Sequence, residues 1–391
     1  MFAMFGATVL VPALTGLSVS ATLLFAGLGT LFFHFVTKGK VPAFLGSSFA
    51  YLAGYAAIAP NGEAALLPYA CVGVAASGLL YLILAALVRG FGANRVMRFF
   101  PPVVTGPIII CIGMTLANSA INNCTGSWDI ALVAILTVVI FNIWGKGMLR
   151  IIPILLGVLV SYVYAAVTGR VDFSGVASAA WIGLPVKMEN TVFSLIGNCD
   201  ANLLVTAIIA IMPIAFATMI EHIGDICAIS STVGANFIAD PGLHRTLLGD
   251  GLATSIASLF GAPANTTYGE NTGVLALTRV YDPLVIRLAA VYAIIASFCP
   301  KFAALVSAMP TGTIGGVSLI LYGMISAIGV RNVVENRVDF TNSRNLIIAA
   351  VIMVCGLGFK IWGNNNEFSG LTFHVGGASV TLTSLAIAAI A

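Results

Sequence analysis

The sequence predicts an all-α polytopic membrane protein whose fourteen spans form two inverted seven-span repeats. Of its 391 residues, 59% are hydrophobic and 8% are charged, and the mean hydropathy is +1.05. Because a soluble domain carries about 25% charged residues, this chain cannot cover a water-exposed surface. The composition excludes a secreted enzyme, a nucleic-acid binder and a receptor with a large soluble domain. The order of the apolar runs and the placement of the basic residues supply the span count.

The apolar runs are separated by Gly, Pro, Asn or charged residues, and each run marks one expected span. A span needs about 20 residues, so the chain has room for fourteen with short connections. The first run is too short to cross a bilayer unaided. The expected spans are 1–12, 18–36, 41–59, 65–88, 99–120, 129–144, 150–167, 203–231, 244–261, 263–278, 283–307, 313–330, 343–362 and 371–391.

The basic residues support this count. Lys and Arg favour cytoplasmic loops. With the N-terminus in the cytoplasm, the even-numbered connections carry 13 of the 17 Lys and Arg residues. Because one span more or fewer in mid-chain would scramble this bias, the sequence predicts fourteen spans and a cytoplasmic N-terminus.

A weak internal match indicates the repeat. The segment from Gly106 to Met114 aligns with the segment from Gly316 to Met324, and each falls in the fifth span of a seven-span half. Because seven is odd, two such halves cross the membrane in opposite directions.

Two segments rich in Gly, Pro and small residues occupy corresponding positions, in the third span of each half. They cover residues 42–51 and 263–273. Such residues leave backbone groups without helical partners, which the membrane tolerates only where they line a cavity. The pair predicts a site for a planar polar ligand. Two kinked packing helices are the alternative.

The acidic residues Glu221, Asp225 and Glu270 fall within expected spans. A carboxylate in hydrocarbon is costly and should face a cavity or a partner. Glu221 and Asp225 are four residues apart and share a helix face, so one proton is expected to be held between them. This pair is a candidate for proton coupling. A neutral, hydrogen-bonded structural pair is the alternative.

The other polar residues in spans receive structural interpretations. Asp250 is expected at the membrane interface or in a structural role, and His34 is expected to be a packing histidine. His222 adjoins Glu221 but points about 100° away around the helix. No metal-ligand spacing and no phosphate-binding loop occurs, so the sequence predicts no metal and no cofactor, and no direct use of ATP.

The segment Glu270-Asn271-x-Gly273-x-x-x-x-Thr278-Arg279 resembles the signature of the nucleobase-ascorbate transporter family, also called nucleobase-cation symporters. The longer string 265–281 is similar to the bacterial uracil permeases of that family, and so are 2–12, 39–49, 240–245 and 315–323. The likeness covers nearly the whole chain.

This resemblance implies a core domain of residues 1–88 and 203–307 and a gate domain of residues 99–167 and 313–391. Short strands would replace helix in the third and tenth spans. It also implies proton-coupled import of uracil across the bacterial inner membrane by a homodimer whose core moves against its gate. The proton is the coupling ion, and the partners are the nucleobase and the bilayer, with no nucleic acid.

Carried over by position, the resemblance implies a set of substrate-binding residues. Glu221 and Glu270 would accept hydrogen bonds from the N–H groups of uracil. The backbone at Phe49 and Gly269 would meet its carbonyl groups. The ring would be walled by Ala7, Phe49, Tyr268 and Tyr322. Proton coupling would rest on Glu221 and Asp225.

Two departures from the family pattern leave alternatives open. Asp225 stands where uracil permeases often have His, as in the purine-transporting branch, so xanthine or urate is the alternative substrate. Family members also have residues before Phe2, so the N-terminus is expected to be truncated. Outside the family, an anion exchanger of the same inverted plan and a receptor that binds a nucleobase without moving it remain alternatives.

Overall fold

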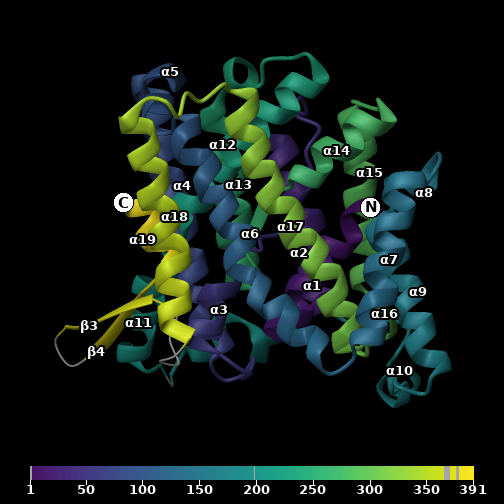
Figure 1. The fold of residues 1–391 in the computed structure, drawn as a ribbon. Helices are drawn as coiled ribbons and strands as arrows, with labels where there is room; N and C mark the ends of the chain where they lie inside the picture. The colour runs from purple at the N-terminus through teal and green to yellow at the C-terminus, as the bar shows by residue number, and fades with distance from the viewer. Residues whose placement is uncertain (1, 198, 365–369, 376–377) are drawn as a thin grey trace.

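The computed structural model describes residues 2–197, 199–364, 370–375 and 378–391. It describes the side chains of 8–197, 199–268, 271–360, 371 and 382–391 among them. Figure 1 shows a bundle of helices that run between two opposite faces of the molecule.

Most described residues are helical. The longer helices are α1 Phe2–Thr15, α2 Val19–Val36, α4 Leu67–Phe91, α6 Pro102–Thr125, α7 Trp128–Trp144, α9 Pro153–Val167, α11 Ala201–Ile211, α12 Ile214–Val233, α13 Leu243–Leu259, α14 Gly269–Thr278, α15 Pro283–Ser297, α17 Thr311–Glu335 and α18 Ser343–Asn364. The shorter ones are α3 Leu52–Ile58, α5 Ala93–Val96, α8 Met148–Ile151, α10 Ser174–Ser178, α16 Pro300–Ser307 and α19 Ser384–Ile390, with the turns η1 Met97–Phe99, η2 Met188–Asn190, η3 Val192–Leu195 and η4 Ile238–Gly242.

Several helix starts follow from single residues. Ser18 caps α2, since its hydroxyl accepts from the Ala21 N–H at 3.2 Å. Asp200 caps α11 by accepting from Asn202 at 2.9 Å. Asp282 caps α15, whose first residue is Pro283.

The described residues contain six helical segments that are long and apolar enough to cross a membrane, including α11 and α12 taken together. The sequence predicted a single span over 283–307, but α15 and α16 meet at a bend of 89°. Pro300 causes this break, because it has no N–H to continue the preceding helix. Two shorter apolar helices, α7 and α9, complete the set.

The segment 371–391 was predicted to be a helical span, and that prediction was wrong for its first part. Strands β3 (Gly370–Val375) and β4 (Ala378–Thr383) form an antiparallel pair, and only α19 is helical. The letters of 371–375 and 378–383 alternate apolar and polar residues, a period of two that favours strand over helix.

The two Gly- and Pro-rich segments are not kinked helices. Each contains an extended stretch with a three-residue strand, β1 (Leu45–Ser47) or β2 (Asn265–Thr267), followed by a short helix, α3 or α14. The strands pair antiparallel, with Gly46 opposite Thr266. Because neighbouring helices surround them, both strands are fully buried.

Close helix packing surrounds this strand pair. α13 lies against α4 and α2, and α2 also lies against α15, while α17 packs along α6 and α7. A Cβ atom on Gly251 of α13 would stand 2.3 Å from the Cβ of Tyr81 on α4, so glycine there allows the two helices to touch. The strand pair is therefore held in a rigid frame.

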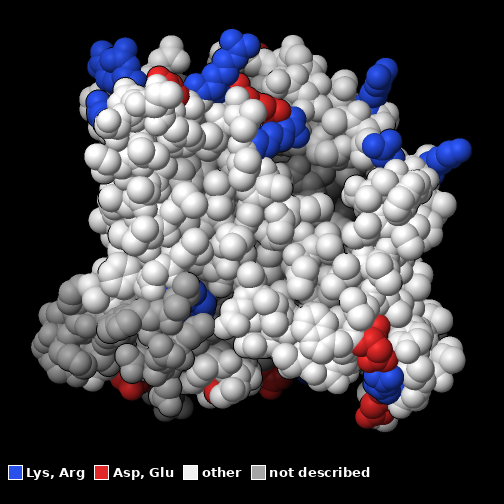
Figure 2. All heavy atoms as spheres, in the orientation of Figure 1, with Lys and Arg blue, Asp and Glu red and all other residues white. Residues whose placement is uncertain are grey.

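Figure 2 shows charged side chains concentrated at the upper and lower ends of the molecule, with a broad belt of uncharged atoms between them. The upper face, where α5 and α8 lie, carries most of the visible Lys and Arg side chains. This distribution matches a protein that sits across a bilayer.

Candidate functional site

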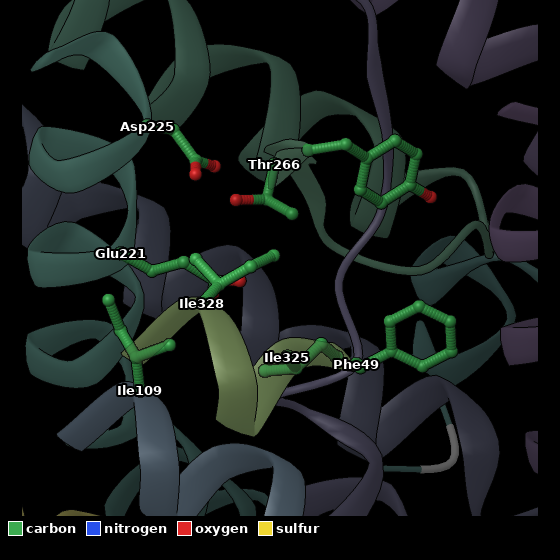
Figure 3. A pocket seen from close by; sticks show the side chains of 8 residues that line it. Phe49, Ile109, Glu221, Asp225, Thr266, Ile325 and Ile328 are labelled. Atoms are coloured by element: carbon green, nitrogen blue, oxygen red, sulfur yellow. The ribbon is translucent and has the colours of Figure 1, made fainter. Parts of the chain in front are cut away.

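A cavity lies where the strand pair meets α12, α6 and α17. Figure 3 shows the side chains that line it. One side is formed by polar and aromatic residues of α12, β2 and the chain after β1, and the other by isoleucines of α6 and α17. The lining residues are Glu221, Asp225, Thr266, Tyr268, Phe49, Ile109, Ile325 and Ile328.

Two carboxylates on α12 reach the cavity. Glu221 and Asp225 lie one turn apart, and Figure 3 shows both extending from α12 toward the same space, facing Thr266. Asp225 is 6% exposed and accepts a hydrogen bond from the Thr267 hydroxyl at 3.0 Å. The spacing expected from the sequence thus places both acids in one site.

The strand β2 divides its side chains between two faces. Thr266 points into the cavity, which Tyr268 also lines. Asn265 and Thr267 point the other way, since the Asn265 amide donates to Phe25 O at 3.0 Å and Thr267 bonds Asp225. This is the two-residue period of a strand. The Thr266 hydroxyl is buried without a hydrogen-bond partner among the described residues, so it remains available to a ligand.

Tyr268 is fixed by β1. Its hydroxyl donates to Ser47 O at 3.0 Å, and its ring lies over Gly46. A Cβ atom on Gly46 would stand 2.4 Å from that hydroxyl. Glycine at this position is therefore required for the aromatic ring to form the cavity wall.

Replacing Gly46 by alanine should displace Tyr268 and weaken ligand binding about tenfold, which corresponds to about 1.4 kcal/mol. The measurement is a ligand titration of the purified protein. Gly273→Ala is the matched control, because a Cβ at Gly273 meets nothing within 4 Å. Equal affinities for the two variants would show that Tyr268 does not shape the site.

Behind Asp225 lies a buried contact between a histidine and a carboxyl group. His222 Nδ1 stands 2.8 Å from Asp250 Oδ2, and neither side chain is exposed. The Thr267 hydroxyl is 3.5 Å from the same His222 nitrogen and bonds Asp225 on its other side. The rings of Phe33 and Tyr81 present edges to the imidazole. The pair therefore connects to the cavity through Thr267 and supports the position of Asp225.

This arrangement decides between two expected places for Asp250. It was predicted at the membrane interface or in a structural role, and the structure buries it completely within α13, which favours the structural role. The reason is its partner: His222 projects from α12 toward α13, on the side away from Glu221. Only the tertiary contact between these helices reveals that pairing.

The other predicted site residues have different outcomes. Phe49 and Tyr268 line the cavity, as expected. Tyr322 is not in the lining but packs against Phe49, with ring centres 5.7 Å apart and an edge-to-face angle of 78°. Ala7, Gly269 and Glu270 lie outside the residues whose side chains are described. The backbone of Gly269 and Glu270 begins α14, directly after Tyr268.

Thr266 and the isoleucines Ile109, Ile325 and Ile328 were missed by sequence reasoning. A strand period applied to the run 265–268 would have found Thr266, because it places Thr266 and Tyr268 on one face. The isoleucines stand in apolar helices and look like any other core residue. Within the described part of the chain, no cluster of three His, Cys, Asp or Glu residues could hold a metal ion.

The cavity is narrow but leads to a wider one. Its own volume is about 20 Å³, room for one water molecule. A second cavity of about 280 Å³ shares Ile109, Asp225 and Ile328 with it and extends to Arg331 and Glu335 near the end of α17. A ring-shaped ligand is larger than this narrow cavity.

The proteins that this chain resembles in sequence are permeases. The sequence profile of the Permease family matches residues 1–363. A uracil permease of Bacillus caldolyticus is 44% identical over 379 residues, 94% of this chain and 85% of the relative. A uracil permease of Bacillus subtilis strain 168 is 41% identical, over 92% of this chain and 83% of the relative. A uracil permease of Escherichia coli strain K12 is 37% identical, over 95% of this chain and 86% of the relative.

Two solved structures share the fold. The transmembrane domain of the cyanobacterial bicarbonate transporter BicA has a TM-score of 0.63 at 15% identity, covering 86% of this chain and 93% of that domain. SLC26A9 has a TM-score of 0.63 at 11% identity, covering 97% of this chain and 68% of that structure. At these identities the likeness concerns the fold alone.

Proposed function

Because this chain belongs to the Permease family, and is therefore a multi-pass membrane transporter and not an enzyme, we propose that it imports uracil across the bacterial inner membrane. The observation that carries this proposal is the cavity between α12 and the strand pair. It combines hydrogen-bond acceptors, a free hydroxyl and aromatic walls in a chain 37–44% identical to uracil permeases.

The chemistry of uracil suits this lining. The ring carries two N–H donors and two carbonyl acceptors in one plane. Glu221 and, by resemblance, Glu270 accept from the N–H groups, because carboxylates are acceptors only. The Thr266 hydroxyl and the backbone N–H groups at Phe49 and Gly269 donate to the carbonyls. Phe49 and Tyr268 flank the ring, Tyr322 holds Phe49 in place, and the family resemblance adds Ala7 to the residues that contact the ring.

The proposed fold has fourteen spans in two inverted halves. The helix contacts support it, since the most extensive of them have counterparts seven spans away. α4 packs on α13 as α15 packs on α2, and α7 packs on α17 as α18 packs on α6. The strands β1 and β2, which belong to the third and tenth spans and so also lie seven spans apart, pair with each other. The N-terminus then faces the cytoplasm, and so does the face that holds α5 and α8.

We propose a core domain of 1–88 and 203–307 and a gate domain of 99–167 and 313–391. The polar and aromatic lining residues all come from the core, and the gate contributes Ile109, Ile325 and Ile328. A substrate bound to the core would then pass the membrane as the core moves against an apolar gate surface. The family resemblance further implies a homodimer.

Proton coupling is proposed at Glu221 and Asp225. They face one cavity, where two close carboxylates disfavour double ionisation. Substrate N–H groups favour a charged Glu221, so substrate binding and the shared proton are linked. The proton is the coupling ion, and we propose no other cofactor.

Replacing Asp225 by asparagine should flatten the pH dependence of uracil uptake between acidic and neutral pH, because the variant has one carboxylate fewer to hold the proton. Initial uptake rates measured across this range in proteoliposomes test it. The control is Asp339→Asn, in the loop before α18. A wild-type pH profile in Asp225→Asn would assign this residue a structural role.

Equilibrium binding distinguishes the alternatives. Uracil should bind the purified protein, and xanthine or urate should compete at least tenfold more weakly; the reverse order would make the protein a purine transporter.

An anion exchanger is the less favoured alternative. The eight residues that line the cavity include two carboxyl groups and no basic side chain, a lining that disfavours an anion. Bicarbonate should therefore not compete with uracil.

A further inference from the structure

A separate cavity lies at the connection between α4 and α6, on the face that holds α5. Its volume is about 630 Å³. The segment from the end of α4 through α5 forms one side, and the chain around η4 forms the other. Its lining includes Phe91, Asn94, Arg95, Arg98, Asn236 and Ile238. None of these residues lines the site proposed for uracil.

The charge of this cavity is positive. Arg95 and Arg98 are exposed, and among the described residues neither lies within 4.0 Å of a carboxylate oxygen. Arg89, in the last turn of α4, adds a third positive charge nearby in the chain. The acid adjoining the lining in sequence, Asp240, forms an ion pair with Lys40. The two lining arginines therefore form no ion pair with any side chain in the described part of the chain.

Hydrogen-bond donors accompany the charge. The Asn236 side-chain oxygen accepts from the Ala239 N–H at 3.1 Å, which leaves the NH₂ group of that amide as a donor. Arginine offers donors only, in a planar fork that matches two oxygens of a phosphate. A cavity with two arginines and amide donors favours a phosphate group.

The location favours a phosphate carried by a lipid. Figure 1 places α5 at the upper end of the bundle, and Figure 2 shows a group of basic side chains there, above the uncharged belt. Phe91 and Phe99, which flank α5, are 59% and 78% exposed. Exposed aromatic rings beside basic residues at the end of a membrane helix are typical of the headgroup level of a bilayer.

We propose that this cavity binds the phosphate headgroup of an anionic phospholipid from the adjacent leaflet. Arg95 and Arg98 hold the phosphate oxygens, the Asn236 amide donates to the same group, and Phe91 and Ile238 contact the glycerol and upper acyl chain. Free inorganic phosphate shares the charge but has nothing to place against the two apolar side chains.

Such a lipid would sit where the proposed core and gate domains are joined. Arg98 and Asn94 also line a further cavity of about 380 Å³ that reaches Thr105 of α6 and Asn332 of α17. A headgroup bound at Arg98 therefore contacts the chain segment that must bend when α4 and α6 move relative to each other. Anionic lipid is expected to change the rate of transport as well as to bind.

The test is a titration of the full-length protein, purified in a neutral detergent, with fluorescent phosphatidylglycerol. The double variant Arg95→Gln/Arg98→Gln should bind this lipid about 30-fold more weakly, roughly fivefold for each arginine. The matched control is Lys146→Gln/Arg150→Gln. It removes two charges at or beside α8, on the same face but at the opposite side of the molecule (Figure 1). The control should bind as the wild type does.

Three further arms decide the source of the phosphate. Phosphatidylcholine with the same acyl chains should compete poorly, millimolar inorganic phosphate should not displace the lipid, and raising the salt concentration should weaken binding to the wild type. Equal binding of both lipids, or wild-type affinity in the double variant, overturns the proposal. Displacement by inorganic phosphate also overturns it, in favour of a soluble anion. Should the double variant not fold, salt-independent binding to the wild type would be equally decisive against it.

Discussion

Replacing Glu221 by glutamine is expected to weaken uracil binding strongly while the protein still folds. The carboxylate of Glu221 faces the cavity and accepts from a ring N–H in the proposed complex. Glutamine keeps the size of the side chain but can turn an NH₂ group toward that N–H, which leaves a donor of the ligand unpaired. A hydrogen bond to a charged group contributes about 1.5–3 kcal/mol, so affinity should fall by about 10- to 150-fold.

The measurement is an equilibrium titration with radiolabelled uracil, together with thermal unfolding in detergent to establish that the variant is folded. Glu189→Gln is the matched control. It makes the same change on an exposed loop, where Glu189 is 72% exposed and lies 3.7 Å from Lys187. A folded Glu221→Gln variant that binds uracil like the Glu189→Gln control would remove Glu221 from the site.

Replacing Asp250 by leucine is expected to cause the largest loss of stability of any single change considered. It leaves His222, fully buried, without the carboxylate 2.8 Å away. A buried polar group left without its partner costs about 1–3 kcal/mol, and more if it is charged. Because Thr267 lies between His222 and Asp225, the position of Asp225 in the cavity should change too.

The double variant Asp250→Leu/His222→Phe is the control for this prediction. Replacing both partners by apolar side chains removes the unpaired polar group, so the double variant should unfold at a higher temperature than Asp250→Leu alone. If the loss of stability in the double variant equals the sum of the losses in Asp250→Leu and His222→Phe alone, His222 and Asp250 do not stabilise each other.

The sequence predicted the positions of the long helices well, because each is an apolar run ended by charge or a turn residue. The expected spans 18–36 and 65–88 correspond to α2, Val19–Val36, and α4, Leu67–Phe91. The break between α15 and α16 was missed, since the apolar run continues across it. The strands β3 and β4 were missed because the prediction followed the apolar character of the segment and not its two-residue alternation.

The candidate site was predicted in part. Glu221 and Asp225 were found from their spacing and from the cost of a charge in hydrocarbon, and Phe49 and Tyr268 from the family resemblance. Thr266 was missed, although its place beside Tyr268 follows from the period of a strand. The partnership of His222 with Asp250 joins two helices 28 residues apart in the chain. No local pattern shows which face of one helix meets the other.

Uptake of radiolabelled uracil into proteoliposomes under an imposed inward proton gradient measures proton-coupled transport itself. We expect accumulation above the external concentration that collapses when a protonophore is added, and an excess of unlabelled uracil should prevent it. Absence of uracil uptake by folded wild-type protein, under a gradient that is shown to persist, would contradict the claim that this chain is a proton-coupled uracil transporter.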